Sequence, residues 1–171
     1  AAGGIVSRYD KLHVFDVNLP NGETYRGSAT VRPGDGAAIA DTPWGRMGLT
    51  ICYDIRFPHL NRQLAKAGAS MIAVPAAFTA PTGEAHWETL LRARAIETGA
   101  FVLAPAQGGL HEDGRRTWGR STVVGPWGEI IAKADHDEPC IVTGKLDMEA
   151  VARARAAVPA LTHDRDFLPA I

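Results

Sequence analysis

Runs of apolar residues bounded by turn residues predict most of the strands of this chain. Residues 71–74, 101–104 and 140–146 are predominantly apolar stretches of the kind found in strands that are buried on both faces. Residues 5–17 are rich in β-branched and aromatic side chains and precede the turn residues Pro20-Asn21-Gly22. We therefore expect residues 5–17 to be extended as well.

Two Pro-Trp-Gly turns predict β-hairpins. The first turn joins the apolar run 37–41 to the run 48–52, and the second joins 121–124 to 129–132. The shared tripeptide is too short to indicate a repeat architecture.

Apolar side chains at helical spacing predict three helices. The first begins near Pro58, a favoured first helical position, and stops at Gly68. The second covers about residues 84–98 and the third about residues 147–157. Strand–helix–strand units together with the two hairpins indicate an α/β fold with a mixed sheet, which we expect residues 1–171 to form as one domain.

Composition narrows the class of protein. The chain has 171 residues, of which 46% are hydrophobic and 22% charged, as in an ordinary globular domain. Its net charge of −1 lacks the basic surplus of a dedicated nucleic-acid binder. The longest apolar stretch, residues 71–78, is far shorter than the ~18 residues that span a bilayer. Two cysteines cannot form a disulfide framework and suggest a reducing compartment, so we expect a cytoplasmic protein without a membrane or nucleic-acid partner.

Cys52 is the first candidate for chemistry, because it ends an apolar run six residues before the helix expected at Pro58. The positive end of a helix favours a nucleophilic thiolate, and neighbouring backbone N–H groups could stabilise an oxyanion. The alternative is an inert, buried strand cysteine, which position alone favours. We expect Cys140, within the predicted strand 140–146, to be structural.

Lys11 and Glu88 are weaker candidates. On the predicted strand 5–17, Lys11 is the one ammonium on a face that is mostly apolar or aromatic, where it could act as an electrophile or a base. It could equally extend to water from the end of the strand. Glu84, Glu88 and Arg92 share one helix face, and the simpler interpretation is a solvated stripe with a Glu88–Arg92 pair.

Searches for other motifs find little. The six histidines have no metal-ligand spacing, neither cysteine has a CxxC partner, and no Gly-rich phosphate-binding loop occurs. A Cys–His hydrolase that uses His59 or His86 stays open.

Taken together, several segments resemble the nitrilase, or carbon–nitrogen hydrolase, superfamily. They are Tyr9-Asp10-Lys11-Leu12-His13-Val14-Phe15-Asp16, Gly48-Leu49-Thr50-Ile51-Cys52-Tyr53-Asp54-Ile55-Arg56-Phe57-Pro58, Val74-Pro75-Ala76-Ala77-Phe78, Thr82-Gly83-Glu84-Ala85-His86-Trp87-Glu88, Arg92-Ala93-Arg94-Ala95-Ile96-Glu97 and Gly125-Pro126-Trp127-Gly128-Glu129. The likeness covers nearly the whole chain and is greatest to the amidases that act on small ω-amides, including deaminated glutathione.

The resemblance implies the C-terminal portion of a four-layer α-β-β-α sandwich that pairs into a homodimer or larger homo-oligomer. It implies no cofactor or metal and a small-molecule amide substrate. Cys52 matches the family's nucleophile, which forms a thioester and releases ammonia. Lys11 matches the catalytic lysine, which would hold the oxyanion together with the Tyr53 N–H. Arg56, Phe78 and Thr82 fall where this branch lines its substrate pocket, and Arg56 suits a substrate carboxylate.

The chain also departs from the family pattern. The family's general-base glutamate lies well upstream of the lysine, and this chain begins ten residues before Lys11, so we expect it to lack that group and about an N-terminal third of the domain. Gly27 stands where the family often has a supporting glutamate. Arg120 replaces a common histidine and Gly125 a common aspartate. Glu88 is a weak candidate as a replacement base.

Two alternatives therefore stay open beside the amidase. The first is a non-catalytic or degenerate module that keeps the fold and takes part in assembly. The second is a hydrolase of N-carbamoyl amides or nitriles within the same family.

Overall fold

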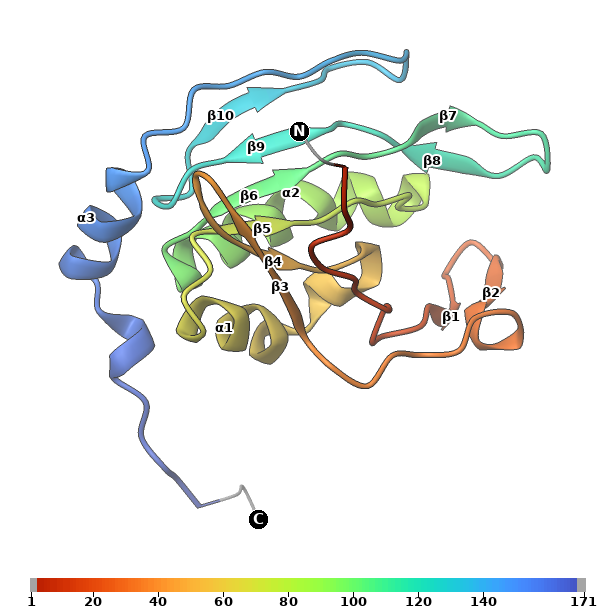
Figure 1. Ribbon diagram of the computed structural model, residues 1–171. Helices are drawn as coiled ribbons and strands as arrows, with labels where there is room; N and C mark the ends of the chain where they lie inside the picture. The colour runs from red at the N-terminus through yellow and green to blue at the C-terminus, as the bar shows by residue number, and fades with distance from the viewer. Residues whose placement is uncertain (1–2, 169–171) are drawn as a thin grey trace.

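A six-stranded mixed sheet is the centre of the computed structural model, which describes residues 3–168 (Figure 1). Its strand order is β10-β9-β6-β5-β4-β3. β4, β5 and β6 are parallel, whereas β3, β9 and β10 are antiparallel to their neighbours. The strands are β3 (Ala38–Thr42), β4 (Gly45–Leu49), β5 (Met71–Ala73), β6 (Phe101–Ala104), β9 (Thr122–Val124) and β10 (Ile130–Lys133). This confirms the expected α/β fold with a mixed sheet.

Two small hairpins lie beside the main sheet. β1 (Asp16–Asn18) pairs with β2 (Thr24–Arg26), and β7 (Gly108–Leu110) pairs with β8 (Arg116–Trp118). The sequence patterns did not predict the β7–β8 hairpin, whose first strand, Gly-Gly-Leu, has little strand character.

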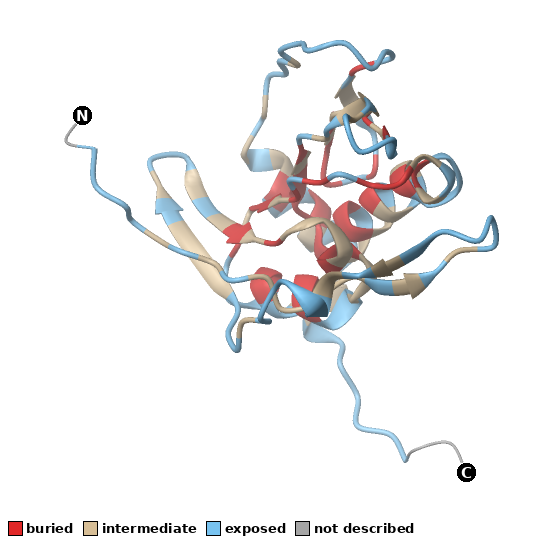
Figure 2. Ribbon diagram, turned by 90° about the vertical axis from the view of Figure 1, so that its right-hand side faces the viewer, coloured by how far each residue is buried: buried red, intermediate tan, exposed pale blue. Residues whose placement is uncertain are grey.

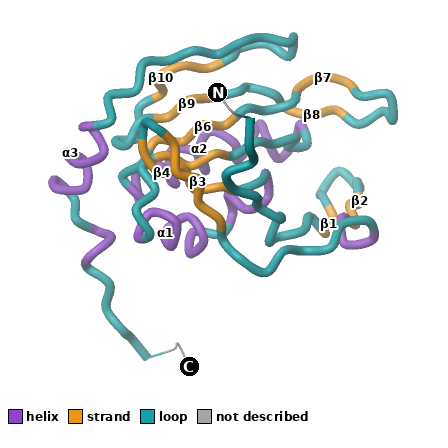
Figure 3. Tube along the Cα trace, in the orientation of Figure 1, coloured by secondary structure: helices purple, strands orange, loops and turns teal. Residues whose placement is uncertain are grey.

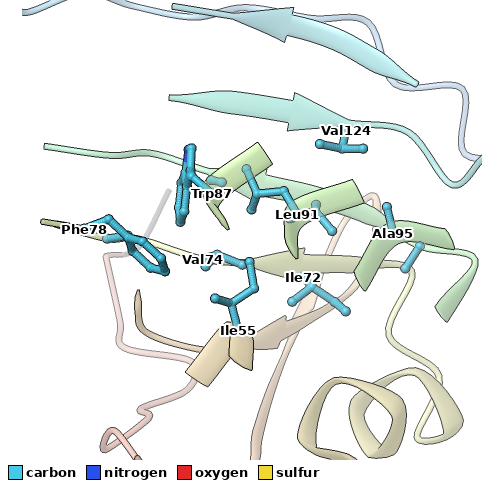
Figure 4. Close-up of a cluster of buried hydrophobic side chains, with 12 residues drawn as sticks. Ile55, Ile72, Val74, Phe78, Trp87, Leu91, Ala95 and Val124 are labelled. Carbon is cyan, nitrogen blue, oxygen red and sulfur yellow. The ribbon is translucent and has the colours of Figure 1, made fainter. Parts of the chain in front are cut away.

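The helices α1 (Pro58–Lys66) and α2 (Ala80–Thr98) cover one face of the sheet. α1 packs on β4, and α2 packs on β6 and β9 (Figure 1). Trp87, Leu91 and Ala95 of α2 meet Ile72 and the other inward side chains of the strands in the main core (Figure 4). These three side chains, four residues apart, are the predicted apolar face of the second helix.

Among the helices within residues 3–168, only α3 (Glu149–Ala157) packs on the opposite face, where Leu146 and Met148 join it. Its Val151 contacts Met71 and Phe101, which point away from α1 and α2 because successive strand residues face opposite sides. Other apolar side chains of this face, including Leu49, Leu103 and Val123, are half-buried. Figure 2 shows the buried residues gathered at the centre of the molecule, where helices pack on the sheet. No helix within residues 3–168 is long and apolar enough to cross a membrane.

α2 begins four residues before its predicted start. Pro81 lies in its first turn, where proline is tolerated, and Gly83 packs against Trp118, with an ideal Cβ only 2.2 Å from the Trp118 Cβ. Both residues look like helix breakers in the sequence. Here one is in the first helical turn and the other allows a close contact.

One predicted strand is absent, and of the segment 5–17 only the last two residues lie in a strand, β1. Residues 5–15 and 140–146 are loops (Figure 3), because neither segment has a neighbouring strand to accept its hydrogen bonds. Ile5 is 92% and Ile141 is 91% exposed. Cys140 is also exposed, so its interpretation as a buried structural cysteine is wrong.

Both Pro-Trp-Gly turns lie at the same end of the sheet. The registers Asp41↔Arg46 and Val102↔Val124 place them at the end where β4, β5 and β6 begin. The segments that follow these three parallel strands therefore meet at the other end, where open α/β sheets commonly bind ligands.

Candidate active site

A cavity of about 670 Å³ opens at the carboxyl ends of β4, β5 and β6. Six residues that the sequence singled out line it: Lys11, Cys52, Tyr53, Arg56, Phe78 and Thr82. The rest of the lining is Phe15, Ile51, Pro75, Ala76, Ala77, Thr79, Pro105, Ala106, Gln107 and Ser121. The wall is thus mostly apolar with a few polar groups, as is usual for a small-molecule site.

Cys52 lies where the chain turns sharply after β4. Its N–H donates to the Pro75 carbonyl at 2.9 Å, and its φ is +52°. A positive φ is strained for a residue with a side chain and persists only where the surrounding contacts impose it. Cys52 is also the first residue of the 3₁₀ helix η2 (Cys52–Arg56), which separates it from α1. The expected direct approach of the thiol to the α1 N-terminus is therefore replaced by this shorter turn.

The turn leaves a backbone donor beside the thiol. The Asp54 N–H donates to the Ile51 carbonyl at 3.1 Å. Among residues 3–168, no acceptor is paired with the Tyr53 N–H, and Tyr53 lines the cavity. This N–H is free to donate to an oxygen that becomes negatively charged beside Cys52.

Lys11 reaches the cavity from a loop. Two residues before it, the Tyr9 hydroxyl donates to the Asp54 carboxylate at 2.8 Å, and two residues after it the His13 N–H donates to the same carboxylate at 3.0 Å. The loop is therefore attached to η2, which carries Cys52. The structure brings Lys11 and Cys52 to one cavity without the strand that the sequence suggested.

Arg56 supplies a cation at the cavity wall. Its guanidinium lies 5.2 Å from the Phe78 ring centroid and 6.0 Å from that of Tyr53. Both terminal nitrogens lie 3.3 Å from His86 Nδ1. Burial lowers the pKa of Arg56, and the neighbouring Tyr53 and Cys52 oppose this shift. An arginine so lowered is still protonated near neutral pH, so it remains a donor for a planar anion.

Thr82, in the first turn of α2, also lines the cavity. Its hydroxyl is 2.8 Å from the Thr79 hydroxyl, which lies in the residue before the helix. The two hydroxyls present a small polar patch close to Phe78.

Glu88 lies outside the cavity. Its carboxylate accepts from Lys133 Nζ at 2.6 Å, and Arg92 instead donates to the Gly128 carbonyl at 2.8 Å. The expected Glu88–Arg92 pair is therefore wrong, because β10 and the turn before it provide nearer partners. No carboxylate of the described residues lines the cavity.

Histidine and metal chemistry find no support in the arrangement. His59 and His86 are absent from the cavity lining, which contains no imidazole. In the described part of the chain, no group of three His, Cys, Asp or Glu side chains is arranged to hold a metal ion.

Two residues that organise the site were missed from the sequence. Asp54 is fully buried beneath the turn, and Arg94 of α2 donates from Nε to the Ile55 carbonyl at 2.6 Å. The signal for Asp54 was its place in the Cys52–Pro58 segment, where only Cys52, Tyr53 and Arg56 were considered. The burial of Arg94 could not be predicted from the sequence, because Arg94 lies on a helix that has charged residues on several sides.

Comparison with known proteins agrees with this geometry. Residues 1–156 match the model of the carbon-nitrogen hydrolase family. A deaminated glutathione amidase from Yersinia enterocolitica is 48% identical over 164 residues, which are 95% of this chain and 57% of that protein. The human omega-amidase is 38% identical over 169 residues, covering 99% of this chain and 61% of the relative. The chain thus spans about three fifths of the length of these relatives.

Solved structures show the same fold. The C. elegans NitFhit protein superposes with a TM-score of 0.85 at 42% identity, covering 92% of this chain and 38% of that one. A mutant of the amidase from Nesterenkonia sp. AN1 superposes with a TM-score of 0.69 at 27% identity, covering 87% of this chain and 53% of that one. In that structure the acetamide moiety of fluoroacetamide is covalently attached to the active-site cysteine. The sequence, the fold and the family match agree: this chain belongs to the carbon–nitrogen hydrolase family.

Proposed function

We propose that this chain contains the nucleophile and substrate pocket of a cysteine-dependent amidase. The enzyme hydrolyses a small, carboxylate-bearing amide to the acid and ammonia. The observation that carries the proposal is the single cavity in which Cys52, Lys11, the unpaired Tyr53 N–H and Arg56 meet. The names of the relatives, amidases of deaminated glutathione and of ω-amides, support this class of substrate.

Each residue has a defined part in the proposed reaction. The Cys52 thiolate attacks the amide carbonyl carbon, and Lys11 and the Tyr53 N–H stabilise the resulting oxyanion. The C–N bond then breaks, the nitrogen takes up a proton and leaves as ammonia, and a thioester remains on Sγ. Water hydrolyses the thioester to the acid and restores the thiol. Arg56 binds the substrate carboxylate, while Phe78 and Thr82 bound the acyl chain.

The cavity has no carboxylate among the described residues. With Lys11 assigned to the oxyanion, the thiol and the attacking water therefore have no carboxylate beside them to act as a general base. A positioned general base contributes about 10²–10⁴-fold to a rate. We expect the 171-residue chain to hydrolyse amides more slowly, by that factor, than an amidase that has its general base. Its thiol should still react with electrophilic amides.

The test measures both steps on the same protein. Ammonia release is followed on a panel of primary ω-amides, N-carbamoyl amides and nitriles, and covalent labelling by iodoacetamide is followed by mass spectrometry. We expect Cys52→Ala to abolish ammonia release and labelling at position 52, and Cys140→Ala, which removes the exposed thiol, to abolish neither. Ammonia release that survives Cys52→Ala would contradict the proposal. Preference for carbamoyl amides or nitriles would reassign the substrate within the family.

The missing carboxylate also favours a second candidate, a non-catalytic module that keeps the fold for assembly. A folded chain whose Cys52 reacts no faster than Cys140 would support it. Absence of turnover with fast Cys52 labelling would instead support an amidase site that lacks its base.

We further propose that residues 1–171 form one domain, that it works without a cofactor in a reducing compartment such as the cytoplasm, and that it forms a homodimer or larger homo-oligomer. Both cysteines are free, as a thiol enzyme needs. The half-buried apolar face of the sheet supports self-association.

A further inference from the structure

We propose that Asp54 is a positioning residue that holds Lys11 at its working place relative to Cys52. This inference rests on the proposed function, in which Lys11 and Cys52 act on the same amide. It assigns a role to a carboxylate that does not line the cavity and whose hydrogen bonds go to Tyr9, His13 and Ile51 and not to the thiol or the lysine ammonium.

The Asp54 carboxylate collects four donors from two segments of the chain. Oδ2 accepts from the Tyr9 hydroxyl at 2.8 Å and from the Ile51 N–H at 2.9 Å. Oδ1 accepts from the His13 N–H at 3.0 Å and lies 2.7 Å from His13 Nδ1. The residue is fully buried, and both carboxylate oxygens are satisfied, as a buried carboxylate requires.

These contacts lie on both sides of each reactive residue. Tyr9 precedes Lys11 by two positions and His13 follows it by two, while Ile51 immediately precedes Cys52 and Asp54 follows it by two. The Asp54 side chain therefore joins the loop of Lys11 to the turn of Cys52 by hydrogen bonds on both sides.

The Lys11 loop has other attachments besides Asp54: the Phe15 ring meets the Tyr53 ring of η2 edge-on with centroids 5.0 Å apart, and Leu12 packs against the cluster of Leu60 and Leu64. The loop belongs to no strand, so no ladder fixes its position. The Gly34 N–H donates to the Lys11 carbonyl at 2.9 Å, and the His13 ring stacks on Phe57 with centroids 3.5 Å apart. The Gly34 contact restrains the peptide of Lys11 but does not reach the turn of Cys52, whereas Asp54 links the two directly.

An asparagine at position 54 would keep the shape but not the bonding. Its amide has one acceptor oxygen, so its NH₂ group would face either the donors at Oδ2 or those at Oδ1. Tyr9 cannot relieve the conflict by losing its proton, because burial raises the pKa of its phenol whether or not position 54 carries a charge. We therefore expect Asp54→Asn to loosen one of the two attachments of the loop.

The test is a double-mutant cycle on the labelling rate of Cys52 by iodoacetamide, which needs no turnover. The variants are Lys11→Met, Asp54→Asn and the two combined, with the exposed Cys140 of each protein as an internal control. We expect each single variant to slow Cys52 labelling by about 10- to 100-fold, since a displacement of about 1 Å can cost this much. We expect the double variant to be no slower than Lys11→Met, because Asp54 acts through Lys11.

Other results would overturn the inference. If the two effects multiply, or if Asp54→Asn has no effect while Lys11→Met slows labelling, Asp54 does not act through Lys11 and only the positioning role falls. If Lys11→Met itself leaves the rate unchanged, the lysine role in the proposed function falls as well.

Tyr9→Phe provides a milder variant if Asp54→Asn fails to fold, which loss of the wild-type circular dichroism spectrum would reveal. It removes the phenol hydroxyl from Asp54 and keeps the ring. We expect about three- to tenfold slower Cys52 labelling, and no further loss when it is combined with Lys11→Met. Multiplying effects in this second cycle would equally overturn the inference.

Discussion

Arg56 is the residue that should decide which amides this cavity accepts. Its guanidinium is half-buried against Phe78 and Tyr53. An anion that binds there loses much of its hydration and accepts hydrogen bonds from a planar pair of donors. We predict that Arg56→Met weakens binding of a short dicarboxylate by about 10- to 100-fold, the usual effect of losing a hydrogen bond to a charged group. Protection of Cys52 against iodoacetamide by the dicarboxylate measures this binding.

His86→Ala is the matched control at the residue scale, because His86 contacts Arg56 but does not line the cavity. It should reduce protection far less than Arg56→Met does. A neutral diamide should protect the wild type and Arg56→Met equally. Equal protection of both proteins by the dicarboxylate would show that Arg56 does not recognise the carboxylate.

At the scale of elements, the segment after α3 is fastened to α1 by charge. Asp164 pairs with Arg62 and Lys66, and these hydrogen bonds hold the pKa of Asp164 below its usual 3.8. The pKa of Asp164 is lower in the folded protein than in the unfolded chain. The pairing therefore stabilises the docked segment after α3 fully when the pH is above 3.8, and this stabilisation is lost as the pH falls further and Asp164 becomes protonated. We predict that the amides of η3 (Ala160–Thr162) exchange faster with solvent below about pH 4.

Hydrogen exchange of the wild type and of Asp164→Asn at several pH values checks this prediction. In the variant, exchange at η3 should be fast already at neutral pH and should change little on acidification beyond the intrinsic chemical rate. The segment around Arg155 should remain protected in both proteins, because its guanidinium donates to the Thr98 and Ala69 carbonyls. Unchanged η3 protection in Asp164→Asn would contradict the prediction.

The elements also show what the sequence could and could not predict. Local patterns found α1, the core of α2 and both Pro-Trp-Gly hairpins, since their partners lie nearby in sequence. Residues 5–15 and 140–146 have strand-like composition but no partner strand in the structure, and no local pattern reports a missing partner. The cavity residues came from motif resemblance. Asp54 was missed because its bonds to Tyr9 and His13 span 45 and 41 positions.

At the scale of the whole molecule, the two faces of the sheet differ. α1 and α2 cover one face, whereas α3 covers only one end of the other, where Leu49, Leu103 and Val123 are half-buried. Partly exposed apolar surface of this kind favours association. We predict a concentration-dependent oligomer in sedimentation experiments, which Val123→Lys should weaken strongly.

Trp44→Lys is its matched control. Like Val123, Trp44 is apolar, and it is larger and more exposed. It lies at the tip of the β3–β4 hairpin instead of on the half-buried face of the sheet. It should leave the association constant nearly unchanged. Association that resists Val123→Lys and yields to Trp44→Lys would place the contact at the hairpin tips.

The positive φ of Cys52 has a consequence for selection. Within residues 3–168 only Cys52 and Arg120 among non-glycine residues have this backbone conformation, which glycine adopts without strain. Replacement of Cys52 by glycine should therefore relieve strain while it removes the nucleophile. A library selected for heat resistance alone should accumulate glycine at position 52, and one selected for reaction with an amide should retain cysteine. At position 52, thermal stability favours glycine, whereas nucleophilic reactivity requires cysteine.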